Sequence, residues 1–99
     1  MELHIQTVNF NAEAKLTEFV QKKIGKLEQV FDHIIAADVF LKKENSSEKD
    51  NKVAEIRVSV PGNEFVVKKQ CASFEEASDQ AIDVLRRQLR NHKEKLRIN

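Results

Sequence analysis

Hydrophobic and polar residues alternate in three separate stretches of the chain, residues 2–8, 37–43 and 53–60, and alternation is the pattern of a half-buried β-strand. Residues 64–71 form a fourth candidate strand, which returns after the third. The last two are separated by Pro61, Gly62 and Asn63, and a proline followed by a glycine is typical of a tight turn. The sequence therefore predicts four strands, the last two of which form a hairpin.

Two other stretches carry apolar residues at helical spacing. The first follows Asn11, a residue type that favours the N-cap position, and it predicts one long helix from about Ala12 to about Phe31. The second follows Ser73, and Glu76 three residues later completes the capping-box pattern. Its apolar stripe consists of Phe74, Ala77, Ala81, Leu85, Leu89, His92 and Leu96. We therefore expect a second long helix over residues 74–96.

The expected order of elements is β-α-β-β-β-α, which predicts an α+β fold. Each helix has one apolar stripe to bury, so the economical arrangement is one four-stranded sheet with two helices packed on one face. A chain of 99 residues and 11.4 kDa has room for one core, so residues 1–99 form a single domain. Residues 44–52 contain nothing apolar and predict a mobile loop. Phe40 and Phe65 leave open which face of the sheet the helices cover.

The composition narrows the classes of protein to which the chain could belong. Hydrophobic residues make up 40% and charged residues 33%, a balance typical of a globular domain. No apolar run approaches the ~20 residues that a membrane span needs, and the first residues do not resemble a signal peptide. The single cysteine, Cys71, suits a reducing compartment. We therefore expect a cytoplasmic protein without a membrane partner.

Residues that could perform catalysis or hold a metal are few and scattered. His4, His33 and His92 fall in three different elements, and Cys71 has no second thiol, so the sequence predicts no metal site. Asp79 and Asp83 lie one helical turn apart, but such a pair is more often a solvated face, and Asp83 could pair with Arg86 or Arg87. We find no catalytic constellation and expect no enzyme activity, no cofactor and no small-molecule substrate.

The net charge of +1 conceals a segregated arrangement of charges. On the second helix, Arg86, Arg90, Lys93 and Arg97 fall within about 60° of one another on a helical wheel. A helix dipole favours bases only in the last turn, so it does not explain a basic ridge that begins at Arg86. Guanidinium groups donate two hydrogen bonds to a phosphate, so the ridge favours a nucleic-acid partner.

The first helix adds further lysines. Lys15, Lys22 and Lys26 share one face, and Lys23 lies at the border of the apolar stripe. If the two helices lie side by side, their basic ridges could join into one surface. The chain has no Trp or Tyr, so we expect recognition of phosphates and RNA shape with little stacking on bases.

Two segments resemble a known family. Residues 23–34 resemble the lysine-leucine-glutamate turn of the sigma-54 modulation protein family, which contains the short ribosome hibernation promoting factors and the related ribosome-associated inhibitor. Residues 81–96 resemble the arginine-glutamine-leucine helix with trailing lysines of the same family. The resemblance covers essentially residues 1–98. It implies a β-α-β-β-β-α fold like that of a double-stranded-RNA-binding domain. It also implies a bacterial protein that binds rRNA of the small ribosomal subunit, competes with tRNA and mRNA for their channel, and promotes inactive ribosome dimers in stationary phase or stress.

The resemblance also implies which residues contact RNA. Lys23, Lys26, Arg87, Lys93 and Lys95 fall on basic positions of the family pattern, and the helical wheel adds Lys22, Arg86 and Arg90. Glu75 and Val84 depart from the pattern, since the best-known members have an aromatic residue and a lysine at these positions. The end of the chain at Asn99 favours the short type of factor.

Three alternatives stay open at this point. A generic structured-RNA-binding module would bind a plain RNA duplex as well as it binds ribosomes. A protein-interaction module would use the open face of the sheet and bind without salt dependence. An enzyme is the weakest of the three. Whether the protein forms ribosome dimers alone or with a second factor is also open.

Overall fold

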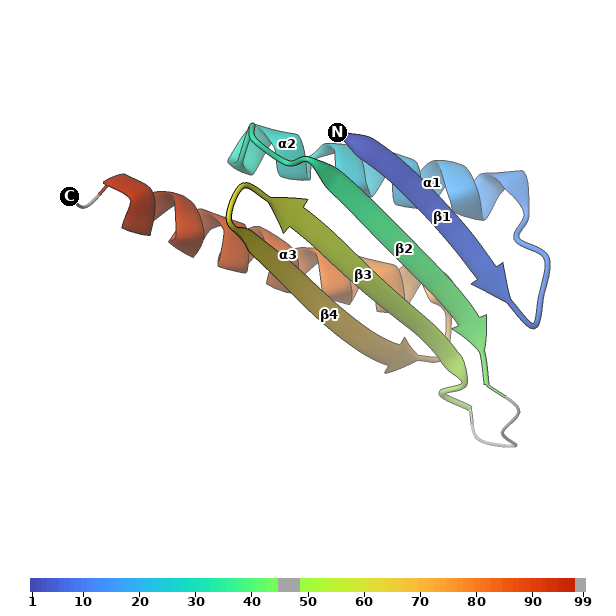
Figure 1. Cartoon of the computed structure of the whole chain (residues 1–99). Coiled ribbons are helices and arrows are strands. Elements are labelled where there is room, and N and C mark those ends of the chain that lie inside the picture. The colour runs from blue at the N-terminus through green and yellow to red at the C-terminus, as the bar shows by residue number, and fades with distance from the viewer. Residues whose placement is uncertain (45–48, 98–99) are drawn as a thin grey trace.

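The computed structural model describes residues 1–44 and 49–97, with side chains as far as Lys95. The middle of the loop predicted over residues 44–52 lies outside the described residues. The elements, labelled in Figure 1, are β1 (Glu2–Val8), α1 (Ala14–Gly25), α2 (Leu27–Val30), β2 (Ala36–Lys43), β3 (Lys52–Val60), β4 (Asn63–Cys71) and α3 (Phe74–Arg97).

The four strands form one mixed sheet in the order β1-β2-β3-β4. β1 runs parallel to β2, and the other two pairs are antiparallel. A parallel pair needs a crossover connection, which α1 and α2 supply. The register places Ile5, Val39, Ile56 and Val67 in one row across the sheet. Since side chains alternate along each strand, this row gives the sheet one apolar face.

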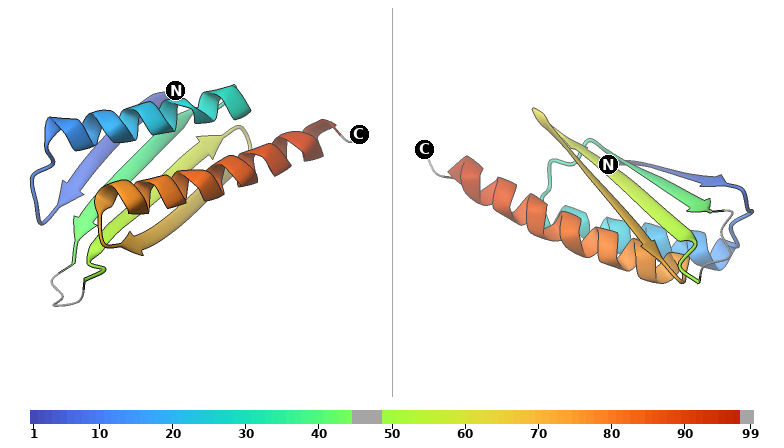
Figure 2. Two further views of the ribbon diagram at one scale, coloured as in Figure 1. Left: turned by 180° about the vertical axis from the view of Figure 1, so that it is seen from behind. Right: turned by 90° about the horizontal axis from the view of Figure 1, so that it is seen from below.

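All the helices cover this apolar face, and the other face is left open (Figure 2). α1 and α3 lie side by side and run in the same direction, and the last turns of α3 extend past the sheet. Fully buried side chains from both layers meet between them, among them Ile24, Leu27, Ile56, Leu85 and Leu89. The predicted α+β fold, with two helical segments on one face of a four-stranded sheet, is confirmed.

The predicted start of the first helix is wrong. The helix begins at Ala14, where the backbone carbonyl of Glu13 accepts hydrogen bonds from the amides of Leu16 and Thr17. The preceding residues are tied elsewhere: the Asn9 side chain donates to the carbonyl of Lys43 at 3.2 Å, and Phe10 stacks on Phe74 with ring centroids 4.3 Å apart. These contacts hold the segment before residue 13 against the sheet and α3, so Asn11 cannot act as the cap.

The single long helix predicted to reach Phe31 is instead broken at Lys26. The Lys26 amide donates to the carbonyl of Lys23, and the Gln29 amide donates to that of Lys26, each at 3.2 Å. These three-residue steps are tighter than those of an α-helix, and the neighbouring Gly25 is a poor helix former. Leu27 remains fully buried after the break.

Two other local predictions, the Ser73 cap and the turn at Pro61 and Gly62, are confirmed, and the structure settles the sides that Phe40 and Phe65 face. The Ser73 hydroxyl accepts a hydrogen bond from the Glu76 amide at 3.1 Å, which caps α3. Gly62 has φ of 79°, the positive value that the β3–β4 turn requires. Phe65 faces the helices, where its ring lies 5.5 Å from that of His92. Phe40 alternates with the buried Val39 and Leu41 and therefore faces the open side.

Candidate nucleic-acid interface

The candidate interface is a groove on the outer side of the helical layer, between α1–α2 and α3. Its first hollow is lined by basic side chains from both sides: Lys23 and Lys26 come from the α1–α2 side, and Arg86 comes from α3. Leu27 and Ile82 form apolar parts of its lining, and Asp79, Gln80 and Asp83 complete it. The helices place these residues together because each buries its apolar stripe against the same sheet and leaves its flank facing the other helix.

A second hollow is lined by residues of α2 and of the following turns of α3. Arg90 and Lys93 contribute the positive charges, and Gln29, Val30 and Glu94 complete the lining. Arg86, Arg90 and Lys93 lie four and then three residues apart, the spacing that keeps side chains on one face of a helix. The buried Leu85 and Leu89 fix this face toward α1 and α2, because they hold the adjacent stripe of α3 on the sheet.

Carboxylates of α3 engage two of the groove's cations and the neighbouring Arg87. Lys23 Nζ lies 3.2 Å from Asp79 Oδ1, which joins α1 to α3. Arg86 Nη2 donates to Asp83 Oδ1 at 2.8 Å, and Arg87 Nη2 lies 3.6 Å from Asp83 Oδ2. The predicted pairing of Asp83 with Arg86 or Arg87 is therefore confirmed for both arginines. Lys23 Nζ also lies 5.6 Å from the centroid of the Phe19 ring, within cation–π range.

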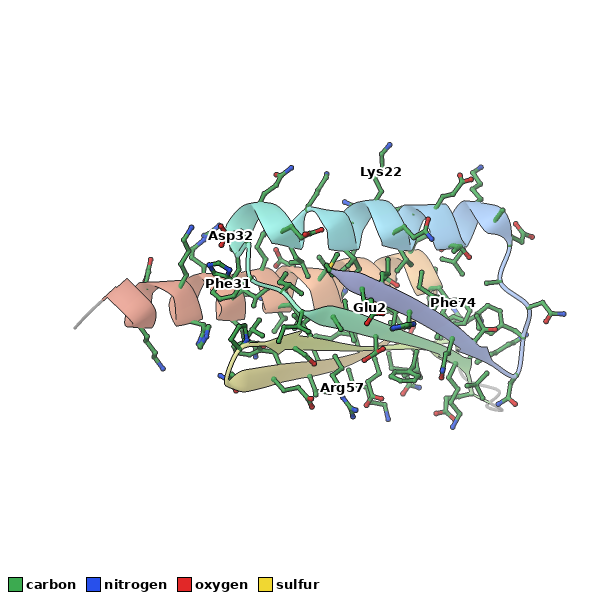
Figure 3. The ribbon with its side chains drawn as sticks, turned by 45° about the horizontal axis from the view of Figure 1, so that its top comes forward. Glu2, Lys22, Phe31, Asp32, Arg57 and Phe74 are labelled. Carbon is green, nitrogen blue, oxygen red and sulfur yellow. The ribbon has the colours of Figure 1, made fainter. Side chains whose placement is uncertain are left out.

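The structure brings five of the eight predicted contact residues into the groove: Lys23, Lys26, Arg86, Arg90 and Lys93. Among the described side chains, Lys22, Arg87 and Lys95 line neither hollow and are exposed on the helices. Figure 3 shows Lys22 pointing away from the sheet. Lys15 lines a separate hollow beside Phe10 and Phe74. The side chain of Arg97 lies outside the described residues.

Sequence reasoning missed two contributions to the groove. The ion pair between Lys23 and Asp79 joins residues far apart in the chain, and no local pattern indicates it. Gln29 and Val30 enter the lining only because the helix breaks at Lys26 and α2 turns beside α3. Both features depend on how the helices pack.

The remaining chemistry-bearing residues support packing. His92 is half-buried, and its ring lies 5.5 Å from each of Phe31 and Phe65, so the prediction of a core-edge histidine is confirmed. Cys71 is buried, and its burial raises the pKa of the thiol, which disfavours the reactive thiolate. In the described part of the chain, no cluster of His, Cys, Asp or Glu is placed to hold a metal ion. None of the described helices is long and apolar enough to span a membrane.

Comparison with known proteins identifies relatives of this chain. The family described as sigma 54 modulation protein / S30EA ribosomal protein matches residues 3–97. The ribosome hibernation promoting factor of Escherichia coli (strain K12) is 37% identical over 97 residues, which cover 98% of both chains. The ribosome hibernation promotion factor of Bacillus subtilis (strain 168) is 33% identical over 98 residues. That match covers 97% of this chain, which spans half the length of the Bacillus protein.

A solved structure confirms the architecture. The N-terminal domain of Protein Y from Thermus thermophilus superimposes with a TM-score of 0.81 at 27% sequence identity, over 93% of this chain and 99% of that one. The sheet order and the placement of the helices are therefore those of a known fold.

Proposed function

Because this chain belongs to the sigma 54 modulation protein / S30EA ribosomal protein family, we propose that it is a ribosome-associated translation inhibitor that binds rRNA of the small subunit. The observation that carries the proposal is the groove itself. Cations from two helical segments, Lys23 and Lys26 on one side and Arg86, Arg90 and Lys93 on the other, line neighbouring hollows. A double row of cations matches a phosphate backbone better than a small ligand.

The groove would recognise phosphates and RNA shape. Each arginine can donate two parallel hydrogen bonds to one phosphate, and each lysine supplies a point charge. The chain has no Trp or Tyr, and the described lining of the two hollows contains charged side chains but no aromatic ring on which a base could stack. Lys22, Arg87 and Lys95, which are exposed outside the two hollows, would contact flanking phosphates.

In this proposal the protein inhibits translation by occupation, without chemistry. The helical layer occupies the channel of the small subunit in which mRNA and tRNA sit, so it competes with both. Ribosomes held in this state accumulate as inactive dimers in stationary phase or stress. The relatives named as hibernation promoting factors support this role.

Co-sedimentation with ribosomes and isolated subunits on a sucrose gradient tests the proposal. We expect the protein to migrate with small subunits and to be displaced by added tRNA. If about six phosphates are contacted, affinity should fall by about 10³ between about 50 and 200 mM salt. A new ribosome-dimer peak would support the hibernation role.

The same gradient separates the alternatives. A generic structured-RNA module would be displaced from the subunits by a plain RNA duplex as readily as by tRNA. A protein-interaction module on the open sheet face would remain bound at high salt. Protein that stays at the top of the gradient at low salt would contradict ribosome binding altogether.

A further inference from the structure

The first hollow of the groove contains two carboxylates that a phosphate-binding surface does not need. Asp79 and Asp83 lie one turn apart on α3, and both line the first hollow among the cations. Their side chains are 59% and 51% exposed. They therefore stand where RNA phosphates would approach.

Helix stability does not explain these two positions. Acidic residues stabilise a helix through its dipole only in the first turn, which α3 fills with Glu75 and Glu76. Ion pairs between exposed side chains contribute little to stability, typically less than about 1 kcal/mol. Two negative charges in the middle of the groove must also lower its affinity for any polyanion. The carboxylates thus weaken the attraction that the surrounding cations provide.

The ion pairs show what the carboxylates do to the cations. Asp79 holds Lys23 from across the groove at 3.2 Å, and Asp83 holds Arg86 at 2.8 Å and Arg87 at 3.6 Å. A phosphate that approaches any of these three cations also approaches a carboxylate, which repels it. A ribose 2′-hydroxyl or the amino group of a base would instead donate a hydrogen bond to that carboxylate.

Resting on the proposed function, we infer that Asp79 and Asp83 determine the selectivity of the groove for its RNA target. They penalise a polyanion that presents phosphates without ribose hydroxyls, such as the backbone of a DNA duplex. They favour a surface on which hydroxyl or amino donors lie between the phosphates, as in folded rRNA.

The test compares the affinities of each variant for isolated small subunits and for a DNA duplex, which lacks the 2′-hydroxyl, in one buffer. Asp79→Asn and Asp83→Asn remove a charge with little change in shape. We expect each to bind the duplex about two- to five-fold more tightly, without a matching gain on small subunits. The preference for small subunits should then fall about 10-fold in the double variant, if the two effects add.

Two further variants complete the design. Glu64→Gln removes a carboxylate that pairs with Arg57 on the open sheet face, so it changes the net charge equally but should leave the preference unchanged. Asp83→Glu keeps the charge and should retain the preference of the wild type. Circular dichroism of each variant checks that the fold is intact.

The outcomes separate this inference from the function on which it rests. If the double Asn variant gains equally on both targets, the carboxylates act only through net charge and the inference is wrong. If the wild type itself shows no preference for small subunits, the proposed function has failed, and the role of the carboxylates fails with it.

Discussion

The helix side of this molecule and the open side of its sheet both carry charged side chains, but they arrange them in opposite ways. On the helix side, Arg86, Arg90 and Lys93 follow one another along a groove. On the open side, opposite charges stand directly across from each other: Arg57 pairs in register with Asp38, and Lys68 with Glu55. Figure 3 shows Lys22 and Arg57 pointing to these two opposite sides of the molecule.

The difference comes from the geometry of the two elements. A helix places every third or fourth residue on one flank, so four or five basic residues in one segment accumulate on a single ridge. In a sheet, each residue faces partners on other strands, and opposite charges across a strand pair stabilise the pairing. The ridge therefore produces a field that reaches a polyanion, whereas the charges on the open face largely cancel. A net charge of +1 describes neither side.

The largest expected effect is the loss of ribosome binding when the ridge is reversed. In Arg90→Glu/Lys93→Glu, two phosphate contacts are lost and two repulsions are added, so we expect affinity for small subunits to fall at least about 100-fold. Arg57→Glu/Lys68→Glu makes the same change in net charge on the open face. We expect it to reduce binding less than about five-fold, measured by co-sedimentation. Equal losses would mean that only net charge matters and that the two sides do not differ.

A second test concerns how the helix side is held together. His92 packs the end of α3 that carries Arg90 and Lys93 against the rest of the protein. Its ring contacts Phe31 at the end of α2 and Phe65 on β4, and such aromatic pairs contribute about 0.5–1.5 kcal/mol each. His92→Ala should therefore lower the free energy of unfolding by about 1–3 kcal/mol, measured by urea denaturation. The matched control, His4→Ala, removes an exposed ring on the open face and should change it by less than about 0.5 kcal/mol.

Local patterns in the sequence were sufficient for most of the fold. The strands, the Ser73 cap and the Pro61–Gly62 turn each depend on residues close in the chain, and all were predicted. The break at Lys26 was not, because the apolar stripe continues past it to Leu27 and Phe31. The start of α1 was not predicted either, since it depends on contacts between distant segments. Asn9 reaches Lys43 on β2, and Phe10 reaches Phe74 on α3. No periodicity within residues 9–31 contains that information.

The same division holds for the candidate site. The ridge on α3 follows from helical spacing alone, so Arg86, Arg90 and Lys93 could be placed together from the sequence. Which lysines in and just after α1 face that ridge depends on how the helices pack. The structure selects Lys23 and Lys26 for the groove and leaves Lys22 pointing outward. The bridge from Lys23 to Asp79 is likewise a property of packing.

A smaller effect is expected when a single lysine is neutralised. Lys26→Gln removes one cation from the groove, so the slope of log affinity against log salt should become shallower by about 1. Lys42→Gln removes an open-face lysine whose Nζ lies 3.7 Å from Glu44 and should leave the slope unchanged. Titrations with small subunits at four or more salt concentrations measure both slopes. A shallower slope for Lys42→Gln alone would indicate that the RNA binds the open face of the sheet and would contradict the proposed groove.

The smallest effect is expected within the open face itself. Arg57 Nε lies 3.3 Å from Glu64 Oε1, and both side chains are about half exposed, so solvent screens their attraction. A double-mutant cycle with Arg57→Ala and Glu64→Ala should give a coupling energy below about 1 kcal/mol in urea denaturation. Arg57→Ala alone should also leave small-subunit affinity nearly unchanged. The charges of the open face would then contribute weakly to stability and not at all to binding. A large coupling would instead show that this face is more ordered than its exposure indicates, and a loss of binding would assign it a part in recognition.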